Sequence, residues 1–259
     1  MINFRLQKPM TLENKRPKPS HIPDMKTAIP MLSRRIGSWE FLISRRPLSK
    51  RCLASRYDTV SSKWVRTARR FQLNAAYREP LLAPQVAIGL MQVDSRARVL
   101  DCGVGNGSLS IALDSLLRSP IDFHAIDISS EMLVQAKSVM EYAGLRPRLQ
   151  QADVLSLPYD DQSFEVVMAA HVLEHLPDPE RALSEMNRVL KPGGMVFLCV
   201  TRPSFFGAVV QLLWRTWAIT EQEGIAWLHA SQLIDIGYQP VRLGSAGFAS
   251  TAFLAWKPQ

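Results

Sequence analysis

The sequence predicts an α/β fold, a doubly wound and mostly parallel sheet of seven strands with helices on both faces. From about residue 97 to the C-terminus, short apolar segments alternate with amphipathic ones. Strand and helix alternating at this spacing form parallel βαβ units. The chain has 259 residues, of which 47% are hydrophobic, so it has enough apolar side chain for a buried core.

Seven segments have the apolar character of buried strands, and turn residues or helix signals separate them. They are residues 97–102, 122–127, 148–152, 164–169, 195–200, 241–243 and 251–255.

The predicted helices lie between these strands. The first covers residues 106–117, and the second is capped by Ser129 or Ser130, with Leu133, Ala136 and Met140 on one face. A third begins at Asp178, an N-cap followed by proline. Its buried face carries Leu183, Met186, Val189 and Leu190, and the Lys-Pro-Gly-Gly sequence that follows ends it. A fourth covers residues 227–236.

Charge divides the chain unevenly. Residues 1–70 contain 17 Lys and Arg against 4 Asp and Glu, a net charge of +13, whereas residues 71–259 have a net charge of −5. We expect residues 1–55 to form a basic, disordered arm and residues 56–259 to form one domain. The high pI belongs to the arm, so no nucleic-acid partner is expected. The Arg- and Ser-rich part of the arm is typical of an organelle transit peptide, and a solvated basic tail is the alternative.

Other features bear on the compartment. No apolar run reaches the ~18 residues of a membrane span, and the longest candidate, residues 205–219, is interrupted by Gln211 and Arg215. The first residues lack the apolar region of a secretory signal. Three scattered cysteines are too few for a disulfide framework. We therefore expect a reducing, cytoplasmic location.

A glycine-rich turn follows the first strand of the predicted sheet. Gly103, Gly105 and Gly107 are spaced G-x-G-x-G, and Asp101 precedes them. Glycine permits close approach of a ligand to the backbone. A dinucleotide site has the spacing G-x-G-x-x-G for a pyrophosphate, which the Asp101 carboxylate would repel. The turn therefore favours an amino-acid-bearing nucleoside and disfavours a nicotinamide oxidoreductase.

Two more carboxylates follow the next strands. Asp127 ends the second strand, where an acid can accept hydrogen bonds from both hydroxyls of a ribose. Capping of the next helix is the alternative role. Asp153 ends the third strand and could accept from the amine of an adenine, with Val154 and Leu155 packed near the ring.

Together these motifs resemble the class I S-adenosylmethionine-dependent methyltransferases, in particular the subgroup that includes ubiquinone/menaquinone-biosynthesis and small-molecule methyltransferases. The segments that carry the resemblance are residues 101–107, 127, 152–153, 157–176 and 190–194. They occur in the order and at the spacing of the family, and the resemblance extends from about residue 56 to the C-terminus.

The resemblance implies a Rossmann-like sheet and S-adenosyl-L-methionine as the cofactor. It implies cofactor contacts by Asp101, Gly103, Gly105, Gly107, Asp127, Ile128, Asp153, Val154 and Ala170. It also implies a helical lid over residues 56–93 that includes Tyr57-Asp58, a cofactor-binding core over residues 97–200, and an acceptor side with the last strands over residues 201–259.

The segment after the fourth strand reads His171-Val-Leu-Glu174-His175, which matches the H-x-x-E-H pattern of some zinc proteases. Zinc would need this pair on a long helix and a third ligand. Pro177 follows too soon for such a helix, so no metal is expected. His171 or His175 as a general base remains open, as does a role in packing.

These features predict methyl transfer to a small or lipophilic acceptor. A catalytically silent relative that binds the cofactor and serves as a partner or assembly subunit is the alternative. The apolar segment 205–217 is expected to form a helix, either as a wall of the acceptor pocket or in peripheral contact with a membrane.

Overall fold

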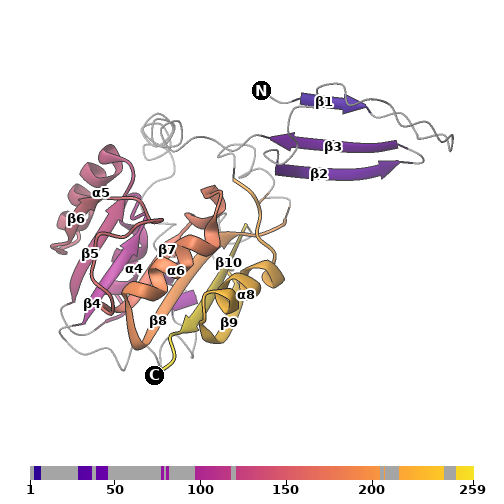
Figure 1. Ribbon diagram of the computed structural model, residues 1–259. Helices are drawn as coiled ribbons and strands as arrows, with labels where there is room; N and C mark the ends of the chain where they lie inside the picture. Colours follow the sequence, from indigo (N-terminus) through magenta and orange to yellow (C-terminus); the bar gives the residue numbers. More distant parts are fainter. Residues whose placement is uncertain are drawn as a thin grey trace. The chain divides into compact units, whose positions relative to one another are not determined.

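The computed structural model describes residues 3–6, 29–36, 39–45, 77–78, 80–81, 97–117, 121–204, 207, 216–241 and 249–259. The chain divides into two compact units, Met1–Arg51 and Cys52–Gln259 (Figure 1). The expected boundary was residue 55. The predictions for Tyr57-Asp58, for most of the lid and for most of the 205–217 helix lie outside the described residues. Residues 77–78 and 80–81 of the lid are helical.

The N-terminal unit contains a small antiparallel sheet in the order β1-β3-β2. Its strands are β1 (Asn3–Leu6), β2 (Ile29–Ile36) and β3 (Trp39–Arg45). In these three segments the expectation of a disordered arm was wrong. The missed signal is Gly37-Ser38, two turn-forming residues between apolar runs, a pattern typical of a β-hairpin. Across this hairpin Arg35 pairs with Glu40 and Ile36 with Trp39 in register.

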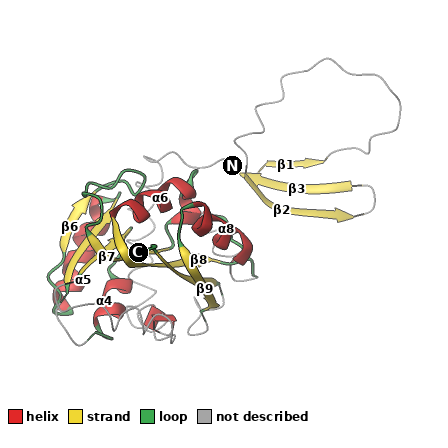
Figure 2. Ribbon diagram, turned by 60° about the horizontal axis from the view of Figure 1, so that its bottom comes forward, coloured by secondary structure: helices red, strands yellow, loops and turns green. Residues whose placement is uncertain are grey.

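The C-terminal unit contains the predicted seven-stranded sheet, in the order β6-β5-β4-β7-β8-β10-β9 (Figure 1). Figure 2 shows the same sheet from another side, with β6, β7, β8 and β9 labelled. The strands are β4 (Arg98–Cys102), β5 (Asp122–Asp127), β6 (Arg148–Gln151), β7 (Phe164–Ala170), β8 (Leu190–Thr201), β9 (Ile234–Pro240) and β10 (Ser250–Trp256). The pairs among β4 to β8 are parallel, whereas β10 runs antiparallel to β8 and β9. The predicted fold class is confirmed.

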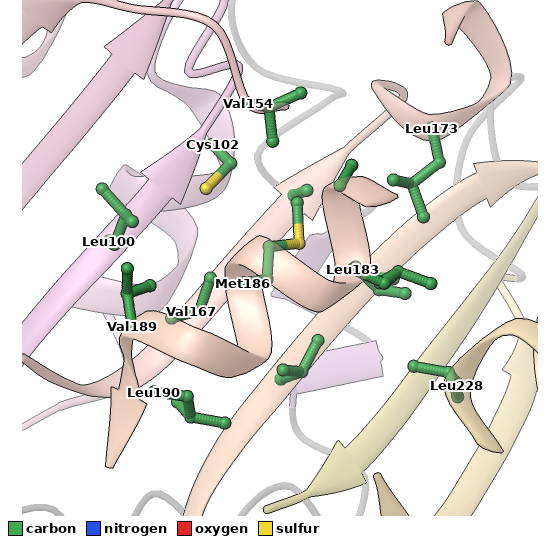
Figure 3. Packing of buried hydrophobic residues seen from close by; sticks show 14 of the residues in the cluster. Leu100, Cys102, Val154, Val167, Leu173, Leu183, Met186, Val189, Leu190 and Leu228 are labelled. Carbon is green, nitrogen blue, oxygen red and sulfur yellow. The ribbon is translucent and has the colours of Figure 1, made fainter. Parts of the chain in front are cut away.

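Successive residues of a strand point to opposite faces of the sheet, and here both faces carry apolar residues that helices cover. On β4, Val99 belongs to the core cluster with α4 (Ser108–Asp114) and α5 (Ser130–Tyr142). Leu100 belongs to the cluster with α6 (Pro179–Val189) and α8 (Glu221–Ala230). Figure 3 shows α6 packed on the strands through Leu183, Met186 and Val189. Both faces are buried, as a parallel sheet requires.

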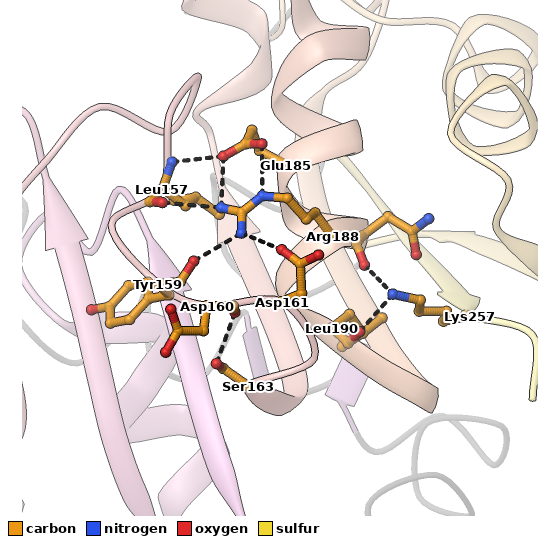
Figure 4. Close-up of polar contacts among 10 residues, drawn as sticks. Leu157, Tyr159, Asp160, Asp161, Ser163, Glu185, Arg188, Leu190 and Lys257 are labelled. Atoms are coloured by element: carbon orange, nitrogen blue, oxygen red, sulfur yellow. Dashed lines mark hydrogen bonds and ion pairs between the residues drawn. The ribbon is translucent and has the colours of Figure 1, made fainter.

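The starts of α5 and α6 agree with the signals in the sequence. Ser129 caps α5, where its hydroxyl accepts from the Met132 N–H at 3.2 Å. Asp178 caps α6, with Pro179 at the first turn. Arg188 ties α6 to the loop before β7, because its guanidinium donates to Glu185, to Asp161 and to the carbonyls of Leu157 and Tyr159 (Figure 4).

The predicted elements near the C-terminus were partly wrong. The helix predicted over residues 227–236 is α8, which begins earlier because Thr220 and Glu223 form a capping box. It ends before Gln232, which has a left-handed φ of 62°. Ile234 then starts β9 and pairs with Trp256. A strand was predicted at residues 241–243. The strand in this part of the chain is β9, which lies earlier and ends at Pro240.

Two other boundaries differ. The Lys-Pro-Gly-Gly sequence does not separate α6 from the next strand. It is part of β8, which begins at Leu190, and the Gly193 N–H donates to the Lys257 carbonyl at 3.1 Å. The helix predicted over residues 106–117 is limited to α4. In the described part of the chain, no helix combines the length and the apolar character that crossing a membrane requires.

Candidate active site

The strand order reverses at β4, since the chain passes from β4 to β5 on one side and to β7 on the other. Ligands of open α/β sheets bind at such a switch point, outside the carboxyl ends of the strands. The residues that the sequence predicts as cofactor contacts lie at the carboxyl ends of β4, β5 and β7 and in the loops after β4, β5 and β6.

The glycine turn after β4 is packed tightly against its neighbours. Gly103, Gly105 and Gly107 have left-handed φ values of 74°, 53° and 80°. A Cβ on Gly103 would lie 2.4 Å from Val172 Cγ2, and one on Gly107 would lie 2.5 Å from Met140 Cγ. Internal packing therefore explains these two glycines. It also places Val172, in the loop after β7, against the loop after β4.

Gly105 differs from the other two glycines. Among the described residues, a Cβ there would meet only Met132 Cε, at an ordinary contact distance of 3.7 Å. The Gly105 N–H donates to Asp127 Oδ2 at 3.0 Å, and the Ser129 N–H donates to Asp127 Oδ1 at 2.9 Å. Asp127 thus joins the glycine turn to the start of α5, while Ser129 caps that helix. These two bonds fix the orientation of the Asp127 carboxylate beside the glycine turn.

Asp101 lies beneath the turn and is almost fully buried, with 1% of its surface exposed. Its Oδ2 accepts from the Ser110 hydroxyl at 2.6 Å. Burial raises the pKa of Asp101 to about 7, and the nearby Asp127 carboxylate adds to the rise. Through Ser110, Asp101 is hydrogen-bonded to the first turn of α4.

The loop after β6 joins the same edge of the sheet. The Ala152 N–H donates to the Asp127 carbonyl at 3.1 Å, which places Asp153 next to the end of β5. Asp153 Oδ1 accepts from the Leu155 N–H at 3.0 Å, and Val154 is buried. The Ile128 carbonyl accepts from Gln151 Nε2 at 2.9 Å.

Ala170 ends β7, beside β8, and His171 directly follows it. Ala170 pairs with Cys199 in register, and the His171 N–H donates to the Cys199 carbonyl at 2.7 Å. His171 Nδ1 lies 2.8 Å from Glu174 Oε1. Glu174 is fully buried, and its Oε1 also accepts from the N–H and the hydroxyl of Thr201, at 3.1 and 2.8 Å.

Burial and charge act in opposite directions on this pair. Burial lowers the pKa of His171 and raises that of Glu174, but their mutual attraction outweighs it. The pKa of His171 is therefore well above its usual value, and the pKa of Glu174 is below its own. The H-x-x-E-H motif forms a histidine–glutamate ion pair around a single 3₁₀ turn, Leu173–His175. Among the described residues no group of three or more His, Cys, Asp or Glu side chains could hold a metal ion.

The structure adds polar residues that the sequence analysis missed. Ser110 is the partner of Asp101, Thr201 is a partner of Glu174, and the Ser250 hydroxyl lies 3.4 Å from His171 Nε2. Ser110 is one turn into the helix after the glycine loop, so its i+9 spacing from Asp101 was a usable signal. No local pattern links Ser250 to His171, which lies 79 residues away.

Comparison with known proteins identifies the domain. A family model described as a methyltransferase domain matches residues 100–198. A phosphatidylethanolamine N-methyltransferase of Cereibacter sphaeroides is 41% identical over 103 residues, which is 39% of this chain and 49% of that protein. A demethylmenaquinone methyltransferase of Desulfitobacterium hafniense is 28% identical over 69% of this chain and 71% of that protein. The chain thus spans about half the length of the first of these relatives.

A solved structure has the same fold. The crystal structure of an S-adenosylmethionine-dependent methyltransferase from Thermotoga maritima aligns with a TM-score of 0.57 at 18% identity, and covers 79% of this chain and 98% of that one. The strand order, the antiparallel β10, the glycine turn and the matched family model agree with one another. Residues 100–198 of the chain therefore match a methyltransferase domain, and the fold is that of S-adenosylmethionine-dependent methyltransferases.

Proposed function

We propose that this protein transfers the methyl group of S-adenosylmethionine to a small or lipophilic acceptor. The contact between Gly105 and Asp127 at the switch point carries this proposal. It combines an open glycine backbone with a fixed carboxylate, the two features that a nucleoside bearing an amino acid requires.

The residues at the switch point fit the cofactor chemically. A side chain at position 105 would occupy the space above the turn, so glycine leaves the backbone open to a ligand. Asp127 is held by two N–H groups in one orientation, and a carboxylate at this strand end is the group that can accept hydrogen bonds from the hydroxyls of a ribose. Asp153 lies at the next strand end, and the buried side chains of Val154 and Leu155 supply an apolar surface beside it.

S-adenosylmethionine, when bound, supplies a methyl group activated by its sulfonium sulfur. The protein then has mainly to align the acceptor and to exclude water. The glycine turn and Asp127 hold the cofactor side of the site. The loop of His171 and Val172 lies against that turn, so the acceptor side meets it at Gly103. Because the bound cofactor supplies the activated methyl group, the cofactor-binding residues are easier to identify than a catalytic base.

The names of the relatives indicate acceptors to test. One relative is a demethylmenaquinone methyltransferase and another a phosphatidylethanolamine N-methyltransferase. Both names refer to lipophilic molecules. An acceptor of this kind is consistent with the apolar sequence of residues 205–217 and with peripheral contact at a membrane.

Calorimetric titration with S-adenosylhomocysteine tests the cofactor site. Asp127→Ala should weaken binding at least tenfold, because about 1.4 kcal/mol corresponds to a factor of ten and two hydroxyl contacts are lost. Ser129→Ala is the matched control, since it also removes a hydrogen bond at the start of α5 but leaves the carboxylate. Equal affinity of Asp127→Ala and the wild type would contradict the proposal.

Transfer of a labelled methyl group tests the activity. The wild-type protein is incubated with labelled S-adenosylmethionine and either demethylmenaquinone in detergent or vesicles of phosphatidylethanolamine. Labelled product that Asp127→Ala forms at least tenfold more slowly, at cofactor concentrations below saturation, supports the proposal. Cofactor binding without transfer to either acceptor would favour a catalytically silent relative.

A further inference from the structure

The backbone at His171 has a conformation that is unusual for this residue. Its φ is 57°, in the left-handed region, although it directly follows the regular strand β7. The hydrogen bond from its N–H to the Cys199 carbonyl, at 2.7 Å, holds it there. Residues in such conformations persist where their surroundings determine them, and they cluster at functional sites.

The side chain of His171 is fixed by one of its two ring nitrogens. Because Glu174 Oε1 is a carboxylate oxygen 2.8 Å from Nδ1, Nδ1 carries a proton and donates it. The N–H and hydroxyl of Thr201 hold the same oxygen, so Glu174 has little freedom to move. The Glu174 backbone carbonyl also accepts from the Trp217 N–H at 3.3 Å. The ring orientation of His171 is thus determined from β8 and from the segment that follows it.

The second ring nitrogen has only weak contacts within the described residues. Nε2 lies 3.4 Å from the Ser250 hydroxyl and 3.9 Å from Cys199 Sγ. The His171 side chain is 30% exposed, whereas Glu174 is not exposed at all. The ring of Tyr77 lies over the same residue, at 6.4 Å between ring centroids. Within the described residues, Nε2 therefore faces a small region formed by Tyr77, Cys199 and Ser250.

This region adjoins the cofactor side of the site. Val172, the next residue, is in the contact with Gly103 described above. We propose that His171 binds an oxygen of the methyl acceptor through Nε2, and that Glu174 is the positioning residue that orients the ring and keeps Nδ1 protonated. This inference rests on the proposed function, and it distinguishes His171 from His175, which the sequence left as equal candidates.

The charged and titratable groups around His171 favour its protonated form. Among the described residues around His171, Glu174 is the one carboxylate. The charges of His171 and His175 stabilise this carboxylate, whose Oε2 has no hydrogen-bond partner among the described residues. The other titratable neighbours are Cys199 on β8 and Tyr77 in the lid. The Glu174 carboxylate raises the pKa of His171 well above its usual value and so favours the imidazolium, in which Nε2 is a hydrogen-bond donor. A donor of this charge recognises an acceptor oxygen that carries negative charge.

Nitrogen NMR of histidine-labelled full-length protein tests the ion pair without any acceptor. In the wild type, the His171 signal, assigned with His171→Gln, should titrate above ~6.5. Glu174→Gln should lower the midpoint by at least about one pH unit, because it removes the carboxylate charge. Glu174→Asp should restore part of the shift, and the exposed His229→Gln is the control that changes nothing. An unchanged midpoint in Glu174→Gln would overturn the role of Glu174.

Demethylmenaquinone, added to the complex with S-adenosylhomocysteine, tests the acceptor contact. We expect it to move the Nε2 resonance of His171. We also expect His171→Gln to lower kcat about a hundredfold, within the range for loss of one hydrogen-bond donor to a negatively charged oxygen. The affinity for S-adenosylhomocysteine should remain within about twofold of the wild type, since the described contacts of Nε2 are with Ser250 and Cys199 and not with Asp127. In Glu174→Gln, the limb of the pH–rate profile should move with the NMR midpoint.

The outcomes separate the two proposals. Transfer by His171→Gln at the wild-type rate would overturn this inference and leave the proposed function intact. If no methyl transfer occurs, the proposed function fails as stated. In that case a His171 Nε2 resonance that still responds to demethylmenaquinone supports the acceptor contact, and one that does not respond overturns it.

Discussion

Gly103→Ala should destabilise the glycine turn after β4 more than Gly105→Ala does. The new methyl group meets two separate penalties. The backbone has a φ of 74°, which an L-residue adopts at a cost of about 1–2 kcal/mol. The Cβ would also lie 2.4 Å from Val172 Cγ2, well inside van der Waals contact.

The two penalties add up to a large fraction of a domain's stability. Relief of the overlap requires a shift of Val172, a stiff β-branched side chain, and overpacking of this kind costs about 1–3 kcal/mol. The expected loss is therefore about 2–5 kcal/mol. Gly105→Ala has a similar φ of 53° but only an ordinary contact at 3.7 Å, so we expect it to lose about 1–2 kcal/mol.

Urea unfolding followed by circular dichroism measures these losses, and a double-mutant cycle separates them. In a Val172→Ala background the overlap is removed, so Gly103→Ala should cost only its conformational share. The coupling free energy between positions 103 and 172 is then about 1–3 kcal/mol. In the same proteins, calorimetry with S-adenosylhomocysteine should give the opposite order, with affinity reduced more by Gly105→Ala than by Gly103→Ala in the Val172→Ala background.

Equal destabilisation by Gly103→Ala in the wild-type and Val172→Ala backgrounds would refute the steric part of this reasoning. Equal destabilisation by Gly103→Ala and Gly105→Ala would lead to the same conclusion. In that case the loop after β7 would not press on the loop after β4, and the proximity of the acceptor side to the glycine turn would lose its support.

Two further predictions concern the charged side chains of Asp101 and Arg188. Asp101 has a folded-state pKa of about 7, above its unfolded value, so the native state binds its proton more tightly and loses stability as pH rises from about 4 to 7, by up to about 1.4 kcal/mol per pH unit. Asp101→Asn should remove this loss, and urea unfolding at several pH values would show parallel curves for the two proteins if the prediction is wrong. Arg188→Met should lower the free energy of unfolding by about 2–3 kcal/mol, because it leaves the carbonyls of Leu157 and Tyr159 without their donor. The exposed Arg181→Met on the same helix is the control, and similar losses for both variants would contradict the argument.

Local signals predicted the central part of the fold well. Asp178 followed by Pro179 predicted the start of α6, and Ser129 as one of two alternatives predicted the cap of α5. These signals work because a helix start leaves N–H groups that a nearby side chain must satisfy. The same reasoning did not locate the start of α8, although Thr220 and Glu223 have the spacing of a capping box.

Strand boundaries near the C-terminus depended on pairing rather than on composition. Gly193 and Gly194 were expected to break the chain, yet they lie in β8, because the Lys257 backbone pairs with both of them. Ile234 was assigned to a helix, yet it pairs with Trp256 in β9. Partners of this kind are far away in the sequence, so a local pattern does not reveal them.

The sequence by itself determined the fold class and the positions of the cofactor candidates. Apolar strands that alternate with helices dictate a parallel sheet, and the carboxyl ends of parallel strands place Asp101, Asp127 and Asp153 at one edge. Only the tertiary structure decided the differences among these acids. Asp101 is buried beneath the turn, whereas Asp127 is held by two N–H groups beside an open glycine.

The surroundings of His171, on the proposed acceptor side, depend almost entirely on the tertiary structure. Because β10 is antiparallel, its first residue, Ser250, lies at the same edge as Thr201, the last residue of β8. That register brings Ser250 to His171, while Thr201 and Glu174 fix the ring. The sequence showed two histidines around a glutamate, but their roles depend on which ring nitrogen the glutamate holds, and this follows from long-range packing.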